Sequence, residues 1–419
     1  MVSGHVGSSG NGVPAQAAVF VCYVPGLDAR LVDERLTPHL SRLRRDHGTV
    51  QIRTFPSTEL VPTIVSGTWP HQHRIWQVSL KPEYRTGARR DVVDLLPDLV
   101  VSTAQCTRHF FDRTYDLAVI PWRRRRRFQQ HRFKYTRRAK SELAMKEFAG
   151  LPSIFGILGE EAKYFFTKDF AELETLSQRL PSGKRRIELL EMYALDLVQH
   201  WHLDNPSVMS DALARTDEFV RVVHERCRRL GVRFLLLVDH GQERITGTVP
   251  LIQTLQRTGV PQTEYSFFVE LASARLWFHS SRARRVLGDA LGALPGTTLL
   301  SWQQMHDYKI CFEDDAFGEL YVFADAGRIF FPHDFHQPIA SRVLGLMDWH
   351  QRQRVDSPVH RGNHGYLPHH PSEQGWLVLD GLGRGRGRSE IELVDIAPSL
   401  LSLVGVEPPD HMQGTAIVS

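Results

Sequence analysis

The sequence predicts an α/β fold built on a doubly wound, mostly parallel sheet that is sandwiched by helices. Residues 234–238 (FLLLV) are all apolar, which is typical of a strand buried on both faces of a parallel sheet. Residues 17–24 (AAVFVCYV) show the same pattern near the N-terminus. Residues 210–230 have the amphipathic spacing of a helix and are followed by Gly231. A helix leading into a strand in this way is the β–α–β rhythm of a doubly wound sheet.

The length and composition fit a globular enzyme. A chain of 419 residues can bury a large core, and its length suggests one large α/β domain with insertions, or two domains. Apolar residues make up 42% and charged residues 23%, which are ordinary values for a globular enzyme. The balance of 51 Lys+Arg against 47 Asp+Glu gives a net charge of +4, too small to require a nucleic-acid partner. We therefore expect a small-molecule substrate.

The sequence also bears on the compartment. Cys22, Cys106, Cys227 and Cys311 lie far apart and form no CxxC pair, so we expect reduced thiols and no disulfide framework. Residues 1–12 lack the basic and apolar regions of a secretion signal. No apolar run approaches the roughly 20 residues that span a bilayer. The expectation is a cytoplasmic protein without a membrane span, and the oligomeric state stays open.

The expected domain organisation is a core interrupted by two insertions. Residues 1–16 are rich in Gly and Ser and are predicted to be disordered. The core is expected in three pieces, 17–100, 185–263 and 351–419. Between them we expect a helical, basic insertion at 101–184, and an α+β cap of short strands around one helix at 264–350.

Two predicted strands are followed by metal-ligand residues. The run 234–238 stops on Asp239 and His240, at the carboxyl end of a strand, where ligands bind in open α/β sheets. Asp28 follows the first strand, after a Pro-Gly turn. A turn or helix-cap role explains Asp28 equally well.

Three further ligand candidates come from other parts of the chain. Asp196 and His200 are spaced i, i+4, which puts both on one face of a helix, and the nearby His202 and Asp204 compete for the role. His364 has glycines close by, which permit a tight approach of the backbone. Asp and His ligands without thiolates suit zinc, or manganese if the site is rich in oxygen. Two such ions about 4 Å apart would clamp a phosphoryl group.

A hydroxyl nucleophile is expected near residue 58. Ser57 and Thr58 precede a short helix-like run that ends at Gly67. A hydroxyl at the start of a helix is near free N–H groups that attract an anion, and it needs activation, for example by a metal ion. A simple N-cap is the alternative role. We favour Thr58 as the nucleophile, and Ser57 competes for the role.

A basic run, Arg123 to Arg127, lies in the first insertion and is followed by further Arg, Lys and aromatic residues. Such a run could bind nucleic acid, an anionic membrane or a phosphorylated substrate, or could form a solvated helix face. Of these roles we prefer the binding of substrate phosphate beside the active site. The expected substrate-binding residues are Arg123 and Arg127 of this run, together with Arg53 and Ser57.

In their order along the chain, these segments resemble the alkaline phosphatase superfamily, in particular its type I phosphodiesterase/nucleotide pyrophosphatase family. The matching segments are PGLD ending at Asp28, STELVPTIVSGTWPHQHRI from Ser57, Asp196 to His200, DHG from Asp239, GNHGY from Gly362, and DIAPSLLSLVGVEPP from Asp395. The resemblance covers roughly residues 17–100, 185–260 and 355–419. It implies that one metal ion is held by Asp196, His200 and His364, and a second by Asp28, Asp239, His240 and the Thr58 hydroxyl.

The activity that the resemblance implies is phosphoryl chemistry. The expected protein is a two-metal phosphohydrolase that cleaves a phosphodiester or pyrophosphate bond in a nucleotide or nucleotide-sugar-like molecule. Thr58 would attack phosphorus in line and give a phospho-enzyme that water then hydrolyses. The alternatives are a phosphomonoesterase or phosphotransferase at the same site, and a non-catalytic protein that binds polyanions.

Three departures from the family pattern affect the predicted site. The segment between the nucleophile and Gly67 is about one residue shorter than usual. Arg74 stands where the family has the glycine of HGI, and Pro25 precedes the glycine of the first motif. The loop on the metal side is therefore expected to differ from that of the family.

Overall fold

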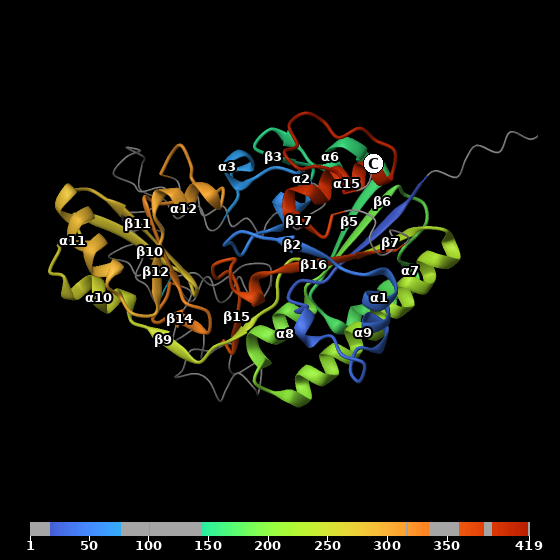
Figure 1. Cartoon of the computed structure of the whole chain (residues 1–419), viewed down its shortest axis with the longest axis horizontal. Coiled ribbons are helices and arrows are strands. Elements are labelled where there is room, and N and C mark those ends of the chain that lie inside the picture. The colour runs from blue at the N-terminus through green and yellow to red at the C-terminus, as the bar shows by residue number, and fades with distance from the viewer. Residues whose placement is uncertain are drawn as a thin grey trace, which may run out of the picture.

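Two sheets lie side by side along the longest axis of the molecule in the computed structural model (Figure 1). The structure describes residues 17–76, 100, 145–315, 317–334, 360–380 and 388–417. The larger sheet carries helices on both faces, which confirms the predicted α/β fold class. Among the described residues, none of the helices has the length and apolar character needed to cross a bilayer.

The larger sheet is mostly parallel, as expected. Within the described residues its strand order is β17 (Glu390–Glu392), β2 (Val50–Arg53), β16 (Gly375–Leu379), β7 (Arg233–Val238), β1 (Val19–Tyr23), β6 (Ile187–Met192) and β5 (Ala162–Thr167). Neighbouring strands are parallel except at β16, which runs antiparallel to both β2 and β7. The carboxyl ends of β1, β6 and β7 therefore lie at one edge of the sheet.

Alternate side chains of the strands enter two separate cores, one on each face of the sheet. In β1, Val19 and Val21 face one core while Phe20 and Cys22 face the other. Cys22 is fully buried and free, and burial raises the pKa of its thiol to about 12. Cys227 and Cys311 are also free, which agrees with the expected lack of disulfides among the described cysteines.

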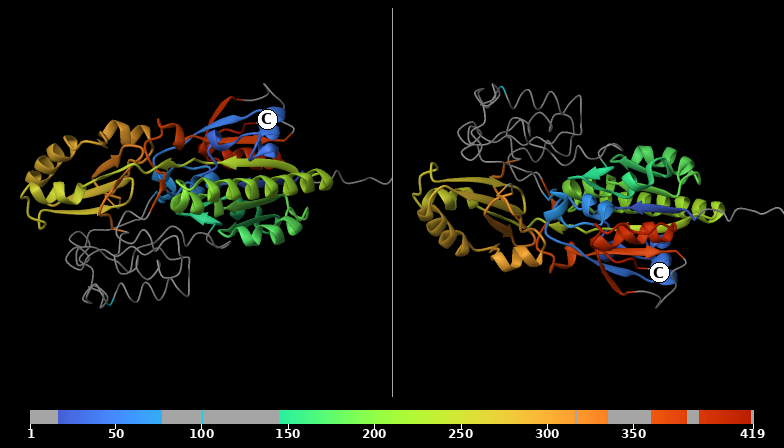
Figure 2. Two further views of the ribbon diagram at one scale, coloured as in Figure 1. Left: turned by 90° about the horizontal axis from the view of Figure 1, so that it is seen from below. Right: turned by 90° about the horizontal axis from the view of Figure 1, so that it is seen from above.

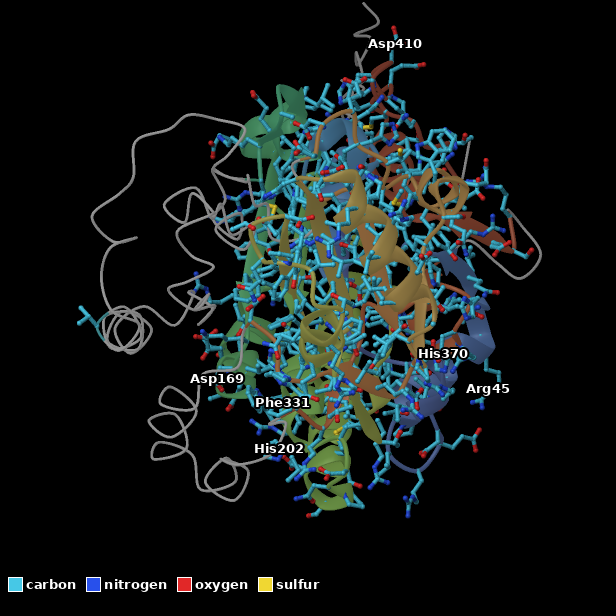
Figure 3. All side chains as sticks on the ribbon, turned by 90° about the vertical axis from the view of Figure 1, so that its left-hand side faces the viewer. Arg45, Asp169, His202, Phe331, His370 and Asp410 are labelled. Atoms are coloured by element: carbon cyan, nitrogen blue, oxygen red, sulfur yellow. The ribbon has the colours of Figure 1, made fainter. Side chains whose placement is uncertain are left out.

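Helices cover both faces of this sheet (Figure 2). One face packs against α1 (Pro38–His47), α7 (Phe170–Arg179), α8 (Ala194–His202) and α9 (Pro206–Leu230). The other packs against α2 (Val61–Ser66), α6 (Ile154–Leu158) and α15 (Ile396–Leu403). Arg45 of α1 and Asp169, which caps α7, lie on opposite flanks of the molecule when it is seen end-on (Figure 3). The first helix layer thus spans the width of the sheet.

The smaller sheet is antiparallel and packs against helices. Its described strands are all antiparallel, in the order β10 (Tyr265–Val269), β11 (Ser273–Phe278), β13 (Leu320–Ala324) and β12 (Thr297–Leu299). Its core also contains residues of α10 (Leu251–Arg257) and α11 (Ser281–Gly292), and β9 (Gly247–Val249) pairs with β14 (Arg328–Phe330). The predicted start at 264 is therefore too late, because α10 shares the apolar core of the smaller sheet.

The boundary predicted at residue 184 also needs correction. β5 extends the larger sheet beside β6, and α7 belongs to its helix layer. Residues 162–184 are therefore part of the core and not of a helical insertion. The disordered N-terminus expected at 1–16, and the basic run Arg123 to Arg127, lie outside the described residues.

The remaining described elements are short and connect the larger ones. They are η1 (Ala29–Leu31), α3 (Pro70–His73), β3 (Glu147–Phe148), β4 (Leu151–Pro152), η6 (Gly159–Glu161), β8 (Glu243–Arg244), α12 (Trp302–Asp307), β15 (Gly362–Asn363), η7 (Pro371–Glu373) and η8 (Leu393–Asp395).

Candidate metal centre and nucleophile

Residues from four distant stretches meet at the carboxyl edge of the larger sheet. Asp239 and His240 follow β7, and Asp196 lies in the first turn of α8, just after β6. A pocket at this edge is lined by Thr58, Asp239, His240 and His364, together with Tyr23, Pro25 and Glu191. The topology therefore brings the predicted ligands Asp239, His240 and His364 and the predicted nucleophile Thr58 to one pocket.

Asp196 lies at the centre of the ligand group and has no exposed surface. Gln242 Nε2 donates to its Oδ1 at 2.6 Å and to its backbone oxygen at 2.9 Å. Its Oδ2 is buried and accepts no hydrogen bond from any described residue. The nearest imidazoles are His200, with Nε2 3.3 Å from Oδ2, and His364, with Nε2 3.8 Å from Oδ1. An orphaned buried carboxylate oxygen among imidazole nitrogens is what a metal ligand requires before the ion binds.

Backbone carbonyls orient two of the histidines. His200 Nδ1 lies 3.0 Å from the oxygen of Gly362, and His240 Nδ1 lies 2.8 Å from the oxygen of Gly241. A carbonyl can only accept, so each Nδ1 carries the proton and each Nε2 is left to face the carboxylates. This arrangement, with one ring nitrogen on a carbonyl and the other free to bind, is typical of metal-ligating histidine.

The charges in the group are mutually stabilising. Burial alone would raise the pKa of Asp196, but the charges of His200 and His364 outweigh it and hold this pKa well below its ordinary value. Burial would lower the pKa of His240, but the carboxylates of Asp239 and Asp196 raise it instead. A cation inside this group could replace a histidine proton, so metal binding and protonation compete.

The donor set fits a divalent ion such as zinc. One ligand atom each from Asp196, His240 and His364 lie within 4.8 Å of one another, and Asp239 Oδ2 lies 3.3 Å from His240 Nε2. The rings of His240 and His364 stack with their centroids 3.8 Å apart. Imidazole nitrogens and carboxylate oxygens without thiolate are the ligands of catalytic zinc sites.

Asp28 has a different environment from the other predicted ligands. Arg30 donates to its Oδ2 through Nε at 2.9 Å and through Nη2 at 2.7 Å, and the backbone N–H of Arg30 donates to Oδ1 at 2.7 Å. Pro25 lines the pocket beside Asp239, whose Oδ2 accepts a hydrogen bond from the Tyr23 hydroxyl. An ionised carboxylate has about four lone-pair sites, so Asp28 can accept from Arg30 and still have a site for an ion; its role as a ligand stays a prediction.

The two candidate nucleophiles differ in exposure. The Ser57 hydroxyl donates to the oxygen of Trp76 at 2.6 Å, accepts from the Glu59 N–H at 2.9 Å, and is 2% exposed. Thr58 is exposed and lines the pocket. Trp76 Nε1 also donates to the oxygen of Pro56 at 2.7 Å, so the backbone of Trp76 holds Ser57 and its buried indole holds the preceding residue. This geometry favours Thr58 as the hydroxyl that meets a substrate.

The other predicted contributors lie apart from the pocket or outside the described residues. Arg53 Nη2 pairs with Glu390 at 3.0 Å, and Arg53 is not among the described residues that line the pocket. Asp204, which competed for the ligand role, pairs with Arg361 at 3.3 Å. Arg123 and Arg127 belong to the residues that the structure does not describe.

Four residues near the site were missed by the sequence reasoning: Tyr23, Glu191, Gln242 and Glu373. Gln242 directly follows the DHG motif, so its position was a usable signal. Glu191 is an acid in the buried strand β6, which is unusual and was also visible. Glu373 accepts the N–H of Gly365 at 2.9 Å, and burial raises its pKa to about 7. Only the fold shows that Glu373 supports the loop that carries His364.

A stability prediction arises at Gly26, whose φ is +78°. A Cβ there would lie 2.8 Å from Gln199 Nε2 and 3.0 Å from Asp196 Oδ1. We expect Gly26→Ala to lower the free energy of unfolding by about 1–3 kcal/mol, through backbone strain and overpacking, and to weaken metal binding. Urea denaturation and a zinc titration check both effects. The matched control is Gly288→Ala in α11, where a Cβ meets nothing within 4 Å; a gain of about 0.5–1 kcal/mol is expected there.

The fold and the donor set together define an α/β protein of the alkaline-phosphatase-like architecture with a candidate metal centre at the carboxyl edge of its sheet. No protein-family model and no curated protein matches the sequence significantly. Human ectonucleotide pyrophosphatase/phosphodiesterase 5 is similar in structure, with a TM-score of 0.60, 13% identity, and coverage of 95% of this chain and 97% of that one.

Two structures of murine ectonucleotide pyrophosphatase/phosphodiesterase 5 are also similar to this chain. One has a TM-score of 0.59 and 14% identity, over 94% of this chain and 96% of that one. The other is an inactive threonine-to-alanine variant in complex with AMP, with a TM-score of 0.58 and 14% identity, over 94% of this chain and 97% of that one. At these identities, the likeness shows a shared fold over nearly the whole chain.

Proposed function

We propose that this protein is a metal-dependent phosphohydrolase that cleaves a phosphodiester or pyrophosphate bond in a nucleotide or nucleotide-sugar-like molecule. The observation that carries the proposal is the pocket itself, where an exposed hydroxyl, Thr58, lies among Asp239, His240 and His364. The murine structural neighbour that binds AMP supports a nucleotide-like substrate. Cytoplasmic location is part of the proposal and rests on the sequence alone.

The proposed ligands form two sets. Asp196, His200 and His364 hold one ion, and Asp28, Asp239, His240 and Thr58 hold the other. Because the Arg30 guanidinium shares the charge of Asp28, we propose that the second ion binds more weakly than the first. Bound divalent ions would lower the pKa of the hydroxyl and neutralise charge on the phosphoryl group.

The reaction follows from the position of Thr58. Its Oγ attacks phosphorus in line, so that an Oγ–P bond forms while the bond from phosphorus to the leaving oxygen breaks. The leaving oxygen takes up a proton and departs as an alcohol or phosphate. A water then attacks the phosphorus bound to Thr58, which still carries its other substituent. The Oγ–P bond breaks, the oxygen of the water stays on the released phosphomonoester, and Thr58 recovers its proton. The loop clamped by Trp76 holds Thr58 in place through both steps.

The test is an assay of the purified chain with zinc, and then manganese, against bis(p-nitrophenyl) phosphate and p-nitrophenyl phosphate. We expect metal-dependent cleavage of the diester that is lost in Asp239→Ala. A preference for the monoester would keep the site but assign it to a phosphomonoesterase. A protein that binds neither metal and turns over neither substrate would contradict the proposal and favour a non-catalytic role.

A further inference from the structure

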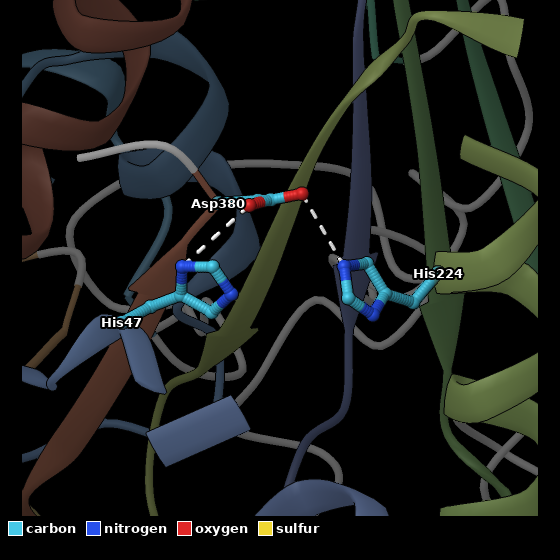
Figure 4. A group of neighbouring side chains, drawn as sticks. All are labelled: His47, His224 and Asp380. Atoms are coloured by element: carbon cyan, nitrogen blue, oxygen red, sulfur yellow. Dashed lines mark hydrogen bonds and ion pairs between the residues drawn. The ribbon is translucent and has the colours of Figure 1, made fainter. Parts of the chain in front are cut away.

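A second group of metal-ligand side chains lies at the other end of the larger sheet. It consists of His47, the last residue of α1, His224 in the C-terminal half of α9, and Asp380, which directly follows β16. Figure 4 shows the carboxylate of Asp380 between the two imidazoles. The N–H of Asp380 donates to the oxygen of Phe234, at the start of β7, whereas Asp239 follows the end of that strand. At about 3.3 Å per residue, the two groups are separated by about 17 Å.

The distances in this group are long for charge-assisted hydrogen bonds and match those around a cation, although His224 and Asp380 are within hydrogen-bonding range. His224 Nε2 lies 3.3 Å from Asp380 Oδ2, and His47 Nδ1 lies 3.5 Å from Asp380 Oδ1. Charge-assisted hydrogen bonds between nitrogen and a carboxylate are shorter, about 2.7–2.9 Å. In a tetrahedron around zinc, with bonds of about 2.0 Å, neighbouring ligand atoms are about 3.3 Å apart. The same 3.3 Å separation occurs between His200 and Asp196 in the centre described above.

A fourth residue orients His224 for this role. His224 Nδ1 lies 3.3 Å from His39 Nε2. In the tautomer with a lone pair on Nε2, His39 can accept a hydrogen bond from His224 Nδ1. When His224 Nδ1 donates to His39, Nε2 keeps its lone pair and faces Asp380. This is again the arrangement in which one ring nitrogen is held by a neighbour and the other binds metal.

We propose that His47, His224 and Asp380 form a second, independent site for a divalent cation of the zinc class, which ties α1 and α9 to the end of β16. Two imidazoles and one carboxylate are a known zinc ligand set. Magnesium and calcium prefer oxygen ligands only, so the two imidazole nitrogens disfavour these ions. The side chains of His47 and Asp380 are 24% and 28% exposed, so water can complete the coordination. The site lies away from Thr58, and we assign it a stabilising role.

The experiment uses the full chain and separates this site from the catalytic one. Wild type, His47→Ala and Asp380→Asn are loaded with zinc and desalted, and bound zinc is measured per chain. We expect each variant to bind one equivalent fewer than wild type and to keep its diester turnover. Asp196→Asn is expected to retain the zinc ion that is bound by His47, His224 and Asp380. His306→Ala, which removes an exposed histidine in α12, is the matched control and should bind as wild type does.

A thermal readout tests the same site without activity. In the Asp196→Asn background, zinc should raise Tm by at least about 3 °C, because the ion binds the folded state. Adding His47→Ala should abolish that shift. His47 is partly exposed at the end of a helix, so this variant is expected to fold. Unchanged zinc content and an unchanged Tm shift in the His47 and Asp380 variants would overturn the proposal.

Discussion

Thr58→Ala is expected to lower diester turnover by at least about 10⁴-fold, the order of magnitude lost when a covalent nucleophile is removed. The side chain is exposed in the pocket, so its removal leaves the core unchanged and stability close to wild type. Steady-state kinetics measure the loss. Mass spectrometry of quenched wild-type reactions should find a phosphoryl group, still esterified to the remaining half of the diester, on the peptide that contains Thr58, and Thr58→Ala should lack it.

Ser57→Ala is the matched control for this prediction. It removes a neighbouring hydroxyl that donates to Trp76 and accepts from Glu59. We expect a loss of stability of about 1–3 kcal/mol from these unsatisfied groups, with the chemical step retained. Thr58→Ser keeps a hydroxyl and should keep part of the activity. If Thr58→Ala remained active while Ser57→Ala lost turnover, the nucleophile would be Ser57.

The sequence was a good guide to the strands that are buried on both faces. β1 and β7 read as continuous apolar runs because helices cover both sides of them, and that signal is strong. β5 was missed because it is the last described strand of the sheet and is only partly buried, so its sequence, AKYFFT, has no clear period. The start of the cap was misplaced because the core that α10 shares with α11 is visible only in three dimensions.

The site was predictable where the geometry is local. Asp196 and His200 could be paired because the i, i+4 spacing on a helix fixes their relation. Asp28 was harder to assign. Whether its carboxylate binds a metal ion or pairs with an arginine depends on side-chain conformations, which the spacing of residues in the sequence does not determine. Here Arg30, two residues away, holds it. The support of Gly365 by Glu373 depends on the path of a loop, which no motif describes.

Asp196→Asn should separate metal binding from folding. The substitution keeps the shape of the side chain, and its oxygen can still accept from Gln242. It removes the negative charge that faces His200 and His364, so the imidazoles lose the carboxylate with which they would share an ion. We expect zinc affinity at this centre to fall by at least about 10²-fold, since even the loss of groups that support a ligand costs 10–100-fold. Competition with a chromogenic chelator measures this affinity.

The matched control is a second buried carboxylate that lies away from the centre. Asp217 is 5% exposed and accepts the N–H groups of His39 and Leu40 at the start of α1. Asp217→Asn should lower stability by about 1 kcal/mol through a weaker helix cap, with zinc affinity at the Asp196 centre and turnover unchanged. If both variants lost stability equally and neither lost zinc, Asp196 would be a structural carboxylate. If Asp196→Asn alone loses zinc and turnover together, the orphaned oxygen of Asp196 is the group on which the metal centre depends.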